Sequence, residues 1–303
     1  MNIVIVGPGA IGSLWAYKLR QAGHKVSLWG TKQNQHWMLA VDDSPEILFN
    51  YNQQPTLIDA DLLLITVKAW QVETAITPLL SHVNKDAILL FMHNGMGAVD
   101  NIAELISEYP VVIATTTHGA LKVDAHHVKH TGIGQTQLGA FNFSAKPNPK
   151  GNQCFFLVDV FNHALPSVSW HPNIQHALWN KLAINCAINP LTAIHQCLNG
   201  TLAEERFRPT LSAIIDELVA VMTAEHIPVK RNQLITTVNN VIHATAANKS
   251  SMYQDIFYRR QTEIDFITGY LVHKAQQHNI HTPTNIELYK QIKLLEQNGK
   301  HYD

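Results

Sequence analysis

The sequence predicts an α/β fold, in which an N-terminal doubly wound parallel sheet is followed by an all-α domain. In the first half, strand-length apolar segments alternate with helix-length amphipathic segments, as in βαβ units. A glycine-rich loop follows the first of these strands, and the pattern beyond residue 169 is helical throughout. At 303 residues the chain can form two cores. We therefore expect domains at 1–168 and 169–303, with a functional site in the cleft between them.

The strands and helices of the first half follow from its hydrophobic pattern. Strands are expected at 2–6, 25–29, 61–67, 87–92, 111–116 and 167–170, and helices at 13–22, 70–80, 98–107 and 152–164. The almost entirely apolar segment 61–67 is typical of a parallel strand covered on both faces. Segment 126–138 alternates more loosely and predicts antiparallel additions at the sheet edge, and 146–151 predicts a turn-rich loop.

Composition and charge exclude several classes of function. Hydrophobic residues make up 46% and charged residues 15% of the chain, as in soluble globular proteins. The net charge is −1 and no basic run stands out, so we expect neither nucleic acid nor an anionic membrane as a partner. The apolar N-terminus lacks a charged leader region and a cleavage site, and no stretch has the length of a transmembrane helix.

Cysteine usage and histidine spacing refine these expectations. Cys154, Cys186 and Cys197 are odd in number and lie in apolar contexts, which indicates reduced core thiols in a cytoplasmic protein. Of the 18 histidines, those at 126, 127 and 130 have spacing that could chelate a metal, but a polar hairpin fits them better. The sequence does not distinguish a monomer from a homodimer.

A dinucleotide-binding fingerprint follows the first predicted strand. It consists of Gly7, Pro8, Gly9, Ala10, Ile11 and Gly12, and it opens a helix within a βαβ unit of the right size. Gly7 permits the tight turn, Gly9 lets a pyrophosphate approach the backbone, and Gly12 lets helix and strand pack closely. The helix N-terminus then offers free N–H groups to phosphates. The alternative, glycines that serve only a tight turn, does not account for this context. The N-terminal domain is therefore expected to be Rossmann-like.

The end of the second strand indicates which dinucleotide binds. An NAD-preferring site carries Asp or Glu about twenty residues after the fingerprint. This chain has Trp29-Gly30-Thr31-Lys32 there, so no carboxylate repels a 2′-phosphate, and Thr31 and Lys32 could bind one. We therefore predict NADP(H). Lys32 could equally be an ordinary solvated lysine.

Three further loops follow strands at the same predicted sheet edge, where open α/β sheets bind ligands. Lys68 comes directly after the apolar run 62–67, and Asn94 stands in the loop 93–97 between His93 and two glycines. The loop 115–120, which ends at Ala120, repeats the pattern. Each loop alone fits a structural turn nearly as well, but together they favour a cofactor site, with Asn94 also able to contact a substrate.

A polar ladder stands in the helical half. Lys181, Asn185 and Asn189 are four residues apart within an apolar stretch, so they fall on one face of a helix. Asparagine is unfavourable inside helices because its amide competes for the backbone, which suggests a wall that holds a polar ligand. Pro190 is expected to end or kink this helix just past Asn189. The alternative is a solvated stripe on a surface helix.

The same half supplies a candidate proton donor. A reductase that uses a nicotinamide cofactor needs an acid beside the carbonyl that receives hydride. Lys181 suits that role, and Glu263, in a partly apolar helical segment, is the best candidate to keep it protonated. Glu263 could instead be a surface residue paired with an arginine at 259 or 260. The neutral hydrogen bonds to a small polar substrate would come from Asn185, Asn189, Asn199 and Ser251.

Several motifs together resemble one known family, the 2-dehydropantoate 2-reductases (ketopantoate reductases). They are GPGAIG at 7–12, TVKAWQ at 66–71, HNGMG at 93–97, TTTH at 115–118, LWNKLAINCAINPLTAI at 178–194, SSMYQD at 250–255 and RRQTEID at 259–265. The motifs run over nearly the whole chain in the order found in the family, and the stretch around Lys181 is the most specific of them.

The resemblance implies NADPH-dependent reduction of 2-dehydropantoate to (R)-pantoate, on the route to pantothenate and coenzyme A. By motif, Lys181 matches the family's proton donor, and Asn185, Asn189, Asn199 and Ser251 match its substrate contacts. The glycine loop, Lys68, Asn94, Ala120 and Glu263 match positions around the cofactor. In place of the arginine that the family often has after the second strand, this chain has Thr31-Lys32. The alternatives are a reductase of another branched 2-oxo acid and a non-enzymatic NADP(H)-binding sensor.

Overall fold

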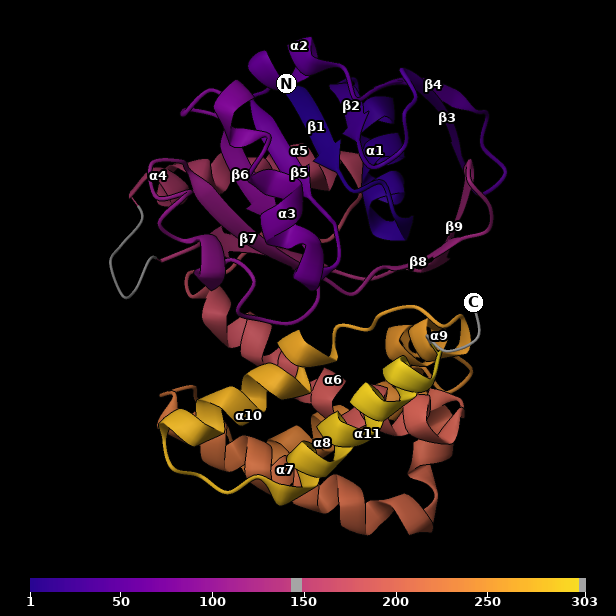
Figure 1. Ribbon diagram of the computed structural model, residues 1–303, viewed down its shortest axis with the longest axis vertical. Helices are drawn as coiled ribbons and strands as arrows, with labels where there is room; N and C mark the ends of the chain where they lie inside the picture. Colours follow the sequence, from indigo (N-terminus) through magenta and orange to yellow (C-terminus); the bar gives the residue numbers. More distant parts are fainter. Residues whose placement is uncertain (143–148, 300–303) are drawn as a thin grey trace. The chain divides into compact units, whose positions relative to one another are not determined.

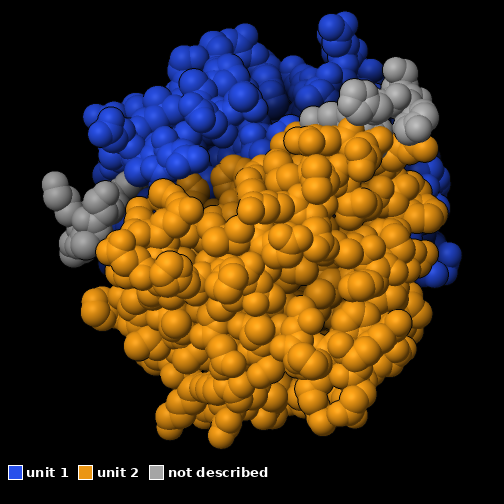
Figure 2. Space-filling view, turned by 60° about the horizontal axis from the view of Figure 1, so that its bottom comes forward, with its two compact units in different colours: residues 1–93, 98–177 blue, residues 94–97, 178–303 orange. Residues whose placement is uncertain are grey.

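The structure is a computed structural model that describes residues 1–142 and 149–299. The chain forms two compact units, coloured separately in Figure 2. Unit 1 comprises Met1–His93 and Ala98–Ala177, and unit 2 comprises Asn94–Gly97 and Leu178–Asp303. The units divide nine residues after the expected limit at 168, because the segment before residue 178 packs in unit 1. A Cβ at Gly139, for example, would lie 2.6 Å from the Cβ of Ile174.

Unit 1 is built on a sheet with helices on it (Figure 1). Its strands are β1 (Asn2–Val6), β2 (Lys25–Trp29), β3 (His36–Val41), β4 (Ile47–Tyr51), β5 (Leu62–Ile65), β6 (Ile88–Phe91), β7 (Val111–Thr116), β8 (Gly119–Lys122), β9 (His127–Gly132), β10 (Thr136–Ala140) and β11 (Val168–Trp170). Its helices are α1 (Ala10–Gln21), α2 (Gln54–Ile58), α3 (Val72–Ile76), α4 (Pro149–Asn152) and α5 (Leu157–Ala164). Short 3₁₀ turns are η1 (Ala69–Gln71), η2 (Leu80–His82), η3 (Asp100–Ile102) and η4 (Gln153–Phe156).

The central part of the sheet is parallel and doubly wound, as predicted. The strand order is β11-β10-β7-β6-β5-β1-β2-β4-β3-β9-β8. From β1 the chain moves outward to β2 and β4, then returns to β5 on the other side of β1 and continues to β6 and β7, with parallel pairing between these neighbours. The direction of winding therefore reverses between β1 and β5. Open α/β sheets bind their ligands at this switch point, outside the carboxyl ends of the strands.

Antiparallel strands lie toward the edges of the sheet, where the sequence predicted them without assigning their partners. Segment 126–138 does add antiparallel pairs, but it is divided between opposite ends of the sheet. β9 pairs antiparallel with β8 at one end, whereas β10 pairs antiparallel with β7 near the other. The antiparallel hairpin β3–β4 was not predicted, although 47–51 has the burial alternation of a half-covered strand.

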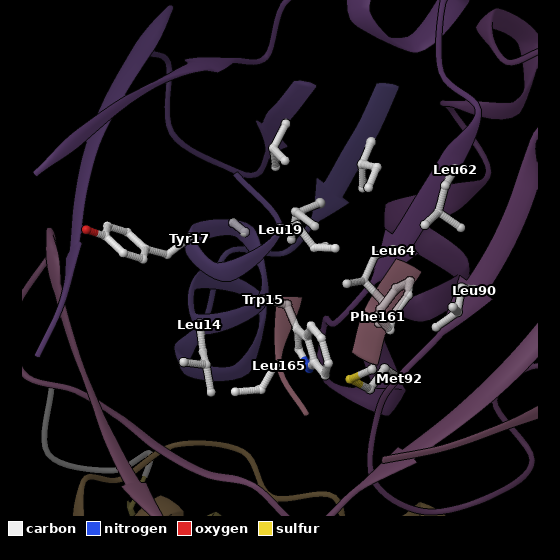
Figure 3. Packing of buried hydrophobic residues seen from close by; sticks show 14 of the residues in the cluster. Leu14, Trp15, Tyr17, Leu19, Leu62, Leu64, Leu90, Met92, Phe161 and Leu165 are labelled. Carbon is white, nitrogen blue, oxygen red and sulfur yellow. The ribbon is translucent and has the colours of Figure 1, made fainter. Parts of the chain in front are cut away.

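Buried side chains on both faces explain why the central strands are so apolar. On one face, Trp15 of α1 packs on Phe161 of α5 with ring centroids 4.9 Å apart, and Leu62, Leu64 and Leu90 of the strands lie around them (Figure 3). The alternate residues of the same strands, such as Leu63 and Leu89, are also fully buried. A sheet covered on both faces places its polar chemistry at the strand ends.

Three predictions for the connections need correction. Segment 70–80 is one short helix, α3, between 3₁₀ turns rather than a continuous helix. Segment 98–107 contains only η3 and turns, because most of its backbone bonds run from residue i+3 to residue i, as from Ile102 N–H to Val99 O at 3.2 Å. Of the expected loop at 146–151, residues 146–148 lie outside the described residues, and 149–151 belong to α4.

Unit 2 is helical, as predicted. Its helices are α6 (Ile174–His195, whose first four residues belong to unit 1), α7 (Arg208–Ala224), α8 (Arg231–Ala244), α9 (Ser251–Phe257), α10 (Thr268–Gln277) and α11 (Pro283–Gly299), with 3₁₀ turns η5 (Asn199–Ala203), η6 (Glu205–Phe207) and η7 (Ile264–Phe266). No helix in the described residues is long and apolar enough to cross a membrane.

Of the two outcomes expected at Pro190, an end or a kink of the helix, the end does not occur. The helix continues through Pro190 to His195. Pro190 is buried among the apolar side chains of unit 2, and burial stabilises the helix across the missing hydrogen bond. Two residues further on, Thr192 Oγ1 lies 2.9 Å from Ile188 O and 3.0 Å from Asn189 O.

Candidate active site

The glycine loop after β1 has the geometry that a dinucleotide requires. Gly7 has a φ of +87°, in the region that favours glycine. A Cβ at Gly12 would overlap Thr66 Oγ1 and Gly7 O, so α1 packs directly on the strand ends. A Cβ at Gly9 would meet nothing closer than Gly7 O, at 4.0 Å. Gly9 therefore borders open space at the N-terminus of α1, where a pyrophosphate could reach the free N–H groups.

The loop after β5 lies directly against the glycine loop. Thr66 Oγ1 donates to Gly7 O at 2.7 Å, and a Cβ at Gly7 would overlap the Val67 side chain. Lys68, the next residue, is partly buried, and its N–H donates to Gln71 Oε1 at 3.2 Å. Thr66 was not singled out from the sequence, although it stands just before the predicted cation. The structure thus brings the predicted residues Gly7, Gly12 and Lys68 to one end of the sheet.

The loop after β2 is held by a residue that the sequence analysis missed. Asn52, which follows β4, donates from Nδ2 to Gly30 O at 2.9 Å and to Lys32 O at 2.6 Å, and its Oδ1 accepts from Gly30 N–H at 2.9 Å. Its φ of +52° suits asparagine better than most side chains. Thr31 and Lys32 are exposed beyond this clamp. A prediction of the β3–β4 hairpin would have placed Asn52 beside them.

Asn94 belongs to unit 2 by its contacts, although it follows a strand of unit 1. Its Nδ2 donates to Glu263 Oε2 at 3.2 Å. The loop is fixed nearby, where Met96 N–H donates to Phe266 O at 2.8 Å. Gly95, with a φ of +79°, packs so closely on Phe266 that a Cβ there would overlap it. The structure therefore joins two predicted site residues that are 169 positions apart in the chain.

Lys181 is placed where a lysine can exchange a proton near neutral pH. Burial lowers the pKa of Lys181 from 10.5 to about 8, and the charge of Glu263 raises it, opposing the burial. Glu263 is 4% exposed, so it is not a solvated surface carboxylate. The partly buried Lys181 thus feels the charge of a buried carboxylate, and Asn94 donates to that carboxylate. Such perturbed groups cluster at functional sites.

The asparagine ladder is not a solvated stripe. Lys181 and Asn185 are partly buried and Asn189 is 7% exposed, on a helix whose other faces contribute to the core of unit 2. All three follow at intervals of four residues on α6, which runs without interruption through this stretch. They therefore lie on one side of the helix, as the spacing predicts.

Asn199 and Ser251 stand at two other positions of unit 2. Asn199 is 7% exposed, and its Nδ2 donates to Thr245 Oγ1 at 2.9 Å. Its Oδ1 is buried without a hydrogen-bond partner among the described residues. Ser251 is exposed at the start of α9. The preceding Ser250 caps α9 by accepting from Tyr253 N–H at 2.9 Å, and Thr192 of α6 donates to Ser250 Oγ at 2.8 Å. This bond fixes the start of α9 beside the end of the ladder.

The predicted residues therefore fall into two groups. The glycine loop, Thr31, Lys32, Lys68 and Ala120 belong to unit 1, and Asn94, Lys181, Asn185, Asn189, Asn199, Ser251 and Glu263 belong to unit 2. A glycine loop on a doubly wound sheet, with a helical unit that carries a buried Lys–Glu pair, defines a dinucleotide-dependent oxidoreductase.

Comparison with known proteins agrees with this class. The model of the ketopantoate reductase PanE/ApbA family matches residues 3–142, and that of its C-terminal domain matches residues 173–296. A 2-dehydropantoate 2-reductase of Vibrio cholerae is 59% identical over 297 residues, 98% of each chain. The chain belongs to the ketopantoate reductase PanE/ApbA family.

Solved structures show the same fold over the whole chain. A PanE/ApbA family ketopantoate reductase from Ralstonia eutropha has a TM-score of 0.86 at 26% identity, covering 99% of this chain and 100% of the other. A D-mandelate dehydrogenase in a ternary structure with NADH and anilino(oxo)acetate has a TM-score of 0.89 at 24% identity and covers 99% of each chain. The second likeness concerns the fold alone.

Proposed function

We propose that this protein catalyses the NADPH-dependent reduction of 2-dehydropantoate to (R)-pantoate, with Lys181 as proton donor. It is an oxidoreductase of the ketopantoate reductase family and uses NAD(P)H. The name of the Vibrio cholerae relative supports the substrate and the place in pantothenate biosynthesis. The observation that carries the mechanism is the partly buried Lys181 on α6 under the charge of Glu263, a carboxylate that is 4% exposed and accepts from Asn94; burial lowers the pKa of Lys181 to about 8.

The residues of unit 1 fit a nicotinamide dinucleotide. Open space at Gly9 and the α1 N-terminus can receive its pyrophosphate, and the exposed Thr31 and Lys32 can receive a 2′-phosphate. Lys68 and Ala120 of the same unit would contact the rest of the cofactor. When bound, NADPH supplies the hydride that adds to the C2 ketone of the substrate.

Lys181 has the properties of the acid in this reaction. A proton donor works best when its pKa lies near the operating pH, which is the case for an ammonium with a pKa of about 8. We propose that its ammonium polarises the ketone oxygen and gives it a proton as negative charge develops there. Glu263 raises the pKa of Lys181 and so keeps a larger share of it protonated at neutral pH.

The asparagines are proposed to hold the substrate. Asn185, Asn189, Asn199 and Ser251, together with Asn94, offer neutral donors and acceptors to the carboxylate and hydroxyl groups of 2-dehydropantoate. Such a set of side chains distinguishes substrates by hydrogen bonding, because an analogue without the terminal hydroxyl leaves an amide group of the site unpaired. We expect kcat/KM for 2-dehydropantoate to exceed that for 2-oxoisovalerate. A higher kcat/KM for 2-oxoisovalerate would instead indicate that the natural substrate is another branched 2-oxo acid.

We also propose that the protein works in the cytoplasm as a monomer or homodimer, without a nucleic-acid or membrane partner. A net charge of −1 and three free cysteines support this proposal. We further propose 1–168 and 169–303 as the limits of the dinucleotide-binding and helical domains.

The test of the proposed function is Lys181→Ala, assayed by NADPH oxidation with 2-dehydropantoate. We expect kcat to fall by roughly 10²–10⁴-fold, the usual contribution of a general acid, while the Kd for NADPH stays within about twofold. Lys290→Ala, which removes an exposed lysine from α11, is the matched control. Turnover of Lys181→Ala near that of the control would refute the role of Lys181. Absence of NADPH oxidation by the wild type with every 2-oxo acid tried would favour the NADP(H)-binding alternative.

A further inference from the structure

A second lysine, which no sequence motif marks, lies at the glycine loop. Lys122 ends β8, and its Nζ donates to Pro8 O, the second residue of the loop, at 3.3 Å. The same ammonium stands 5.8 Å from the centroid of the Trp37 ring. Lys122 is 114 positions from Pro8, so only the pairing of β8 and β9 at the end of the sheet brings it there.

Lys122 also interacts electrostatically with Lys32, in the loop after β2. Lys122 is exposed to solvent overall, but the protein around its ammonium and the positive charge of Lys32 both lower its pKa, whereas Asp124 raises it. The Asp124 carboxylate already accepts from the N–H groups of His126 at 2.7 Å and His127 at 2.9 Å. Two like charges held near each other repel, and a bound anion would relieve that repulsion.

The end of β2 has little room for a side chain at Gly30. A Cβ at Gly30 would overlap the hydroxyl of Tyr51, so any side chain there, a carboxylate included, would have to displace Tyr51. The clamp from Asn52 holds the backbone of Lys32 beside it, with Nδ2 on Lys32 O at 2.6 Å. In folds of this type the adenosine ribose lies between the first loop and the end of the second strand. A Cβ at Gly30 would also lie 3.2 Å from Cδ of Pro8, the residue to which Lys122 donates.

We propose that Lys122, together with Lys32, binds the 2′-phosphate of NADP(H) in this protein. The inference rests on the proposed use of NADPH and adds the residues that select it. A phosphate monoester carries close to two negative charges near pH 7, which two ammonium groups can balance. In this chain the pair takes the place of a single arginine after the second strand.

The experiment measures binding without turnover. NADPH, NADH, adenosine 2′,5′-bisphosphate and ADP are titrated by calorimetry into the wild type, Lys122→Met and Lys122→Arg. Methionine removes the charge but keeps an unbranched apolar side chain, whereas arginine keeps the charge. Lys129→Met, an exposed lysine on β9 of the same hairpin, is the matched control. Circular dichroism and Tm establish that each variant is folded.

We expect Lys122→Met to weaken the binding of NADPH and of adenosine 2′,5′-bisphosphate by about 10- to 100-fold, because one charge-assisted contact is lost. The affinities for NADH and ADP should stay unchanged. Its affinity for NADPH should also depend less steeply on salt, while Lys122→Arg and Lys129→Met bind like the wild type. Wild-type preference for NADPH that survives in Lys122→Met would overturn the role of Lys122 and leave the proposed function intact. A wild type that binds NADPH and NADH equally would overturn both the Lys122 site and the NADPH preference, and one that binds neither would overturn the proposed function.

Discussion

Replacing Glu263 by glutamine tests whether the buried carboxylate sets the proton affinity of Lys181. Glutamine has the shape of glutamate and still offers an oxygen to Asn94 Nδ2, so the change removes charge more than structure. Because burial lowers the pKa of Lys181 and Glu263 raises it, the variant should have a still lower pKa at Lys181. The fraction of enzyme that can donate a proton then falls at a lower pH.

The size of the effect follows from the structure. Burial has already brought the pKa of Lys181 from 10.5 to about 8 in the presence of Glu263. An opposite charge close to an ionisable group is worth about 1–3 pH units. The alkaline limb of kcat/KM should therefore move from about pH 8 to about pH 7 or below. At pH 8, about half of the wild type and about a tenth or less of the variant would carry the proton.

The assay is the pH dependence of kcat/KM for NADPH oxidation with 2-dehydropantoate, in buffers of constant ionic strength. Asp265→Asn is the matched control, because that carboxylate lies two residues away but binds Tyr289 Oη at 2.7 Å and Lys293 Nζ at 3.0 Å. Its alkaline limb should coincide with that of the wild type. An unchanged limb in Glu263→Gln, or a wild-type limb near pH 10, would refute the assigned roles of Glu263 and Lys181.

Two further predictions concern the packing that positions the site. Gly12→Ala should lower the free energy of unfolding by about 1–3 kcal/mol and weaken NADPH binding, because the new Cβ overlaps Thr66 Oγ1 and Gly7 O. Chemical denaturation measures the stability and calorimetry measures the binding. An unchanged free energy of unfolding would contradict the close packing of α1. Thr192→Val removes the fully buried donor to Ser250 Oγ and should lower the free energy of unfolding by about 1–3 kcal/mol. It should also raise KM for 2-dehydropantoate more than it lowers kcat. An unchanged KM would show that α9 does not depend on this bond.

The parallel sheet and the ladder were accessible from the sequence because both depend on local spacing. Alternation of strands with helix-length segments is visible in the order of residues, and so is the Gly7–Gly12 fingerprint. The interval of four between Lys181, Asn185 and Asn189 fixes their common side on any helix. The sequence also distinguished a parallel core from the antiparallel additions, although it could not divide the latter between the two ends of the sheet.

At Pro190 a local rule failed. Pro190 removes a helical hydrogen bond, yet it is buried and α6 continues to His195, against an intrinsic preference of about 3 kcal/mol. Segment 98–107 has the spacing of a helix but forms a 3₁₀ turn and other turns. The hairpin β3–β4 was missed although Asp42, Ser44 and Pro45 between its strands are typical turn residues.

By itself, the sequence determined the fold class, the dinucleotide loop and the lysine on its polar ladder. Only the tertiary structure decided which side chains act on one another. It joins Asn94 to Glu263 across 169 positions, sets the pKa of Lys181 through burial, and brings Lys122 to Pro8 across 114 positions. The physical reason is that proton affinity and anion binding depend on solvation and on charges nearby in space, which spacing along the chain does not specify.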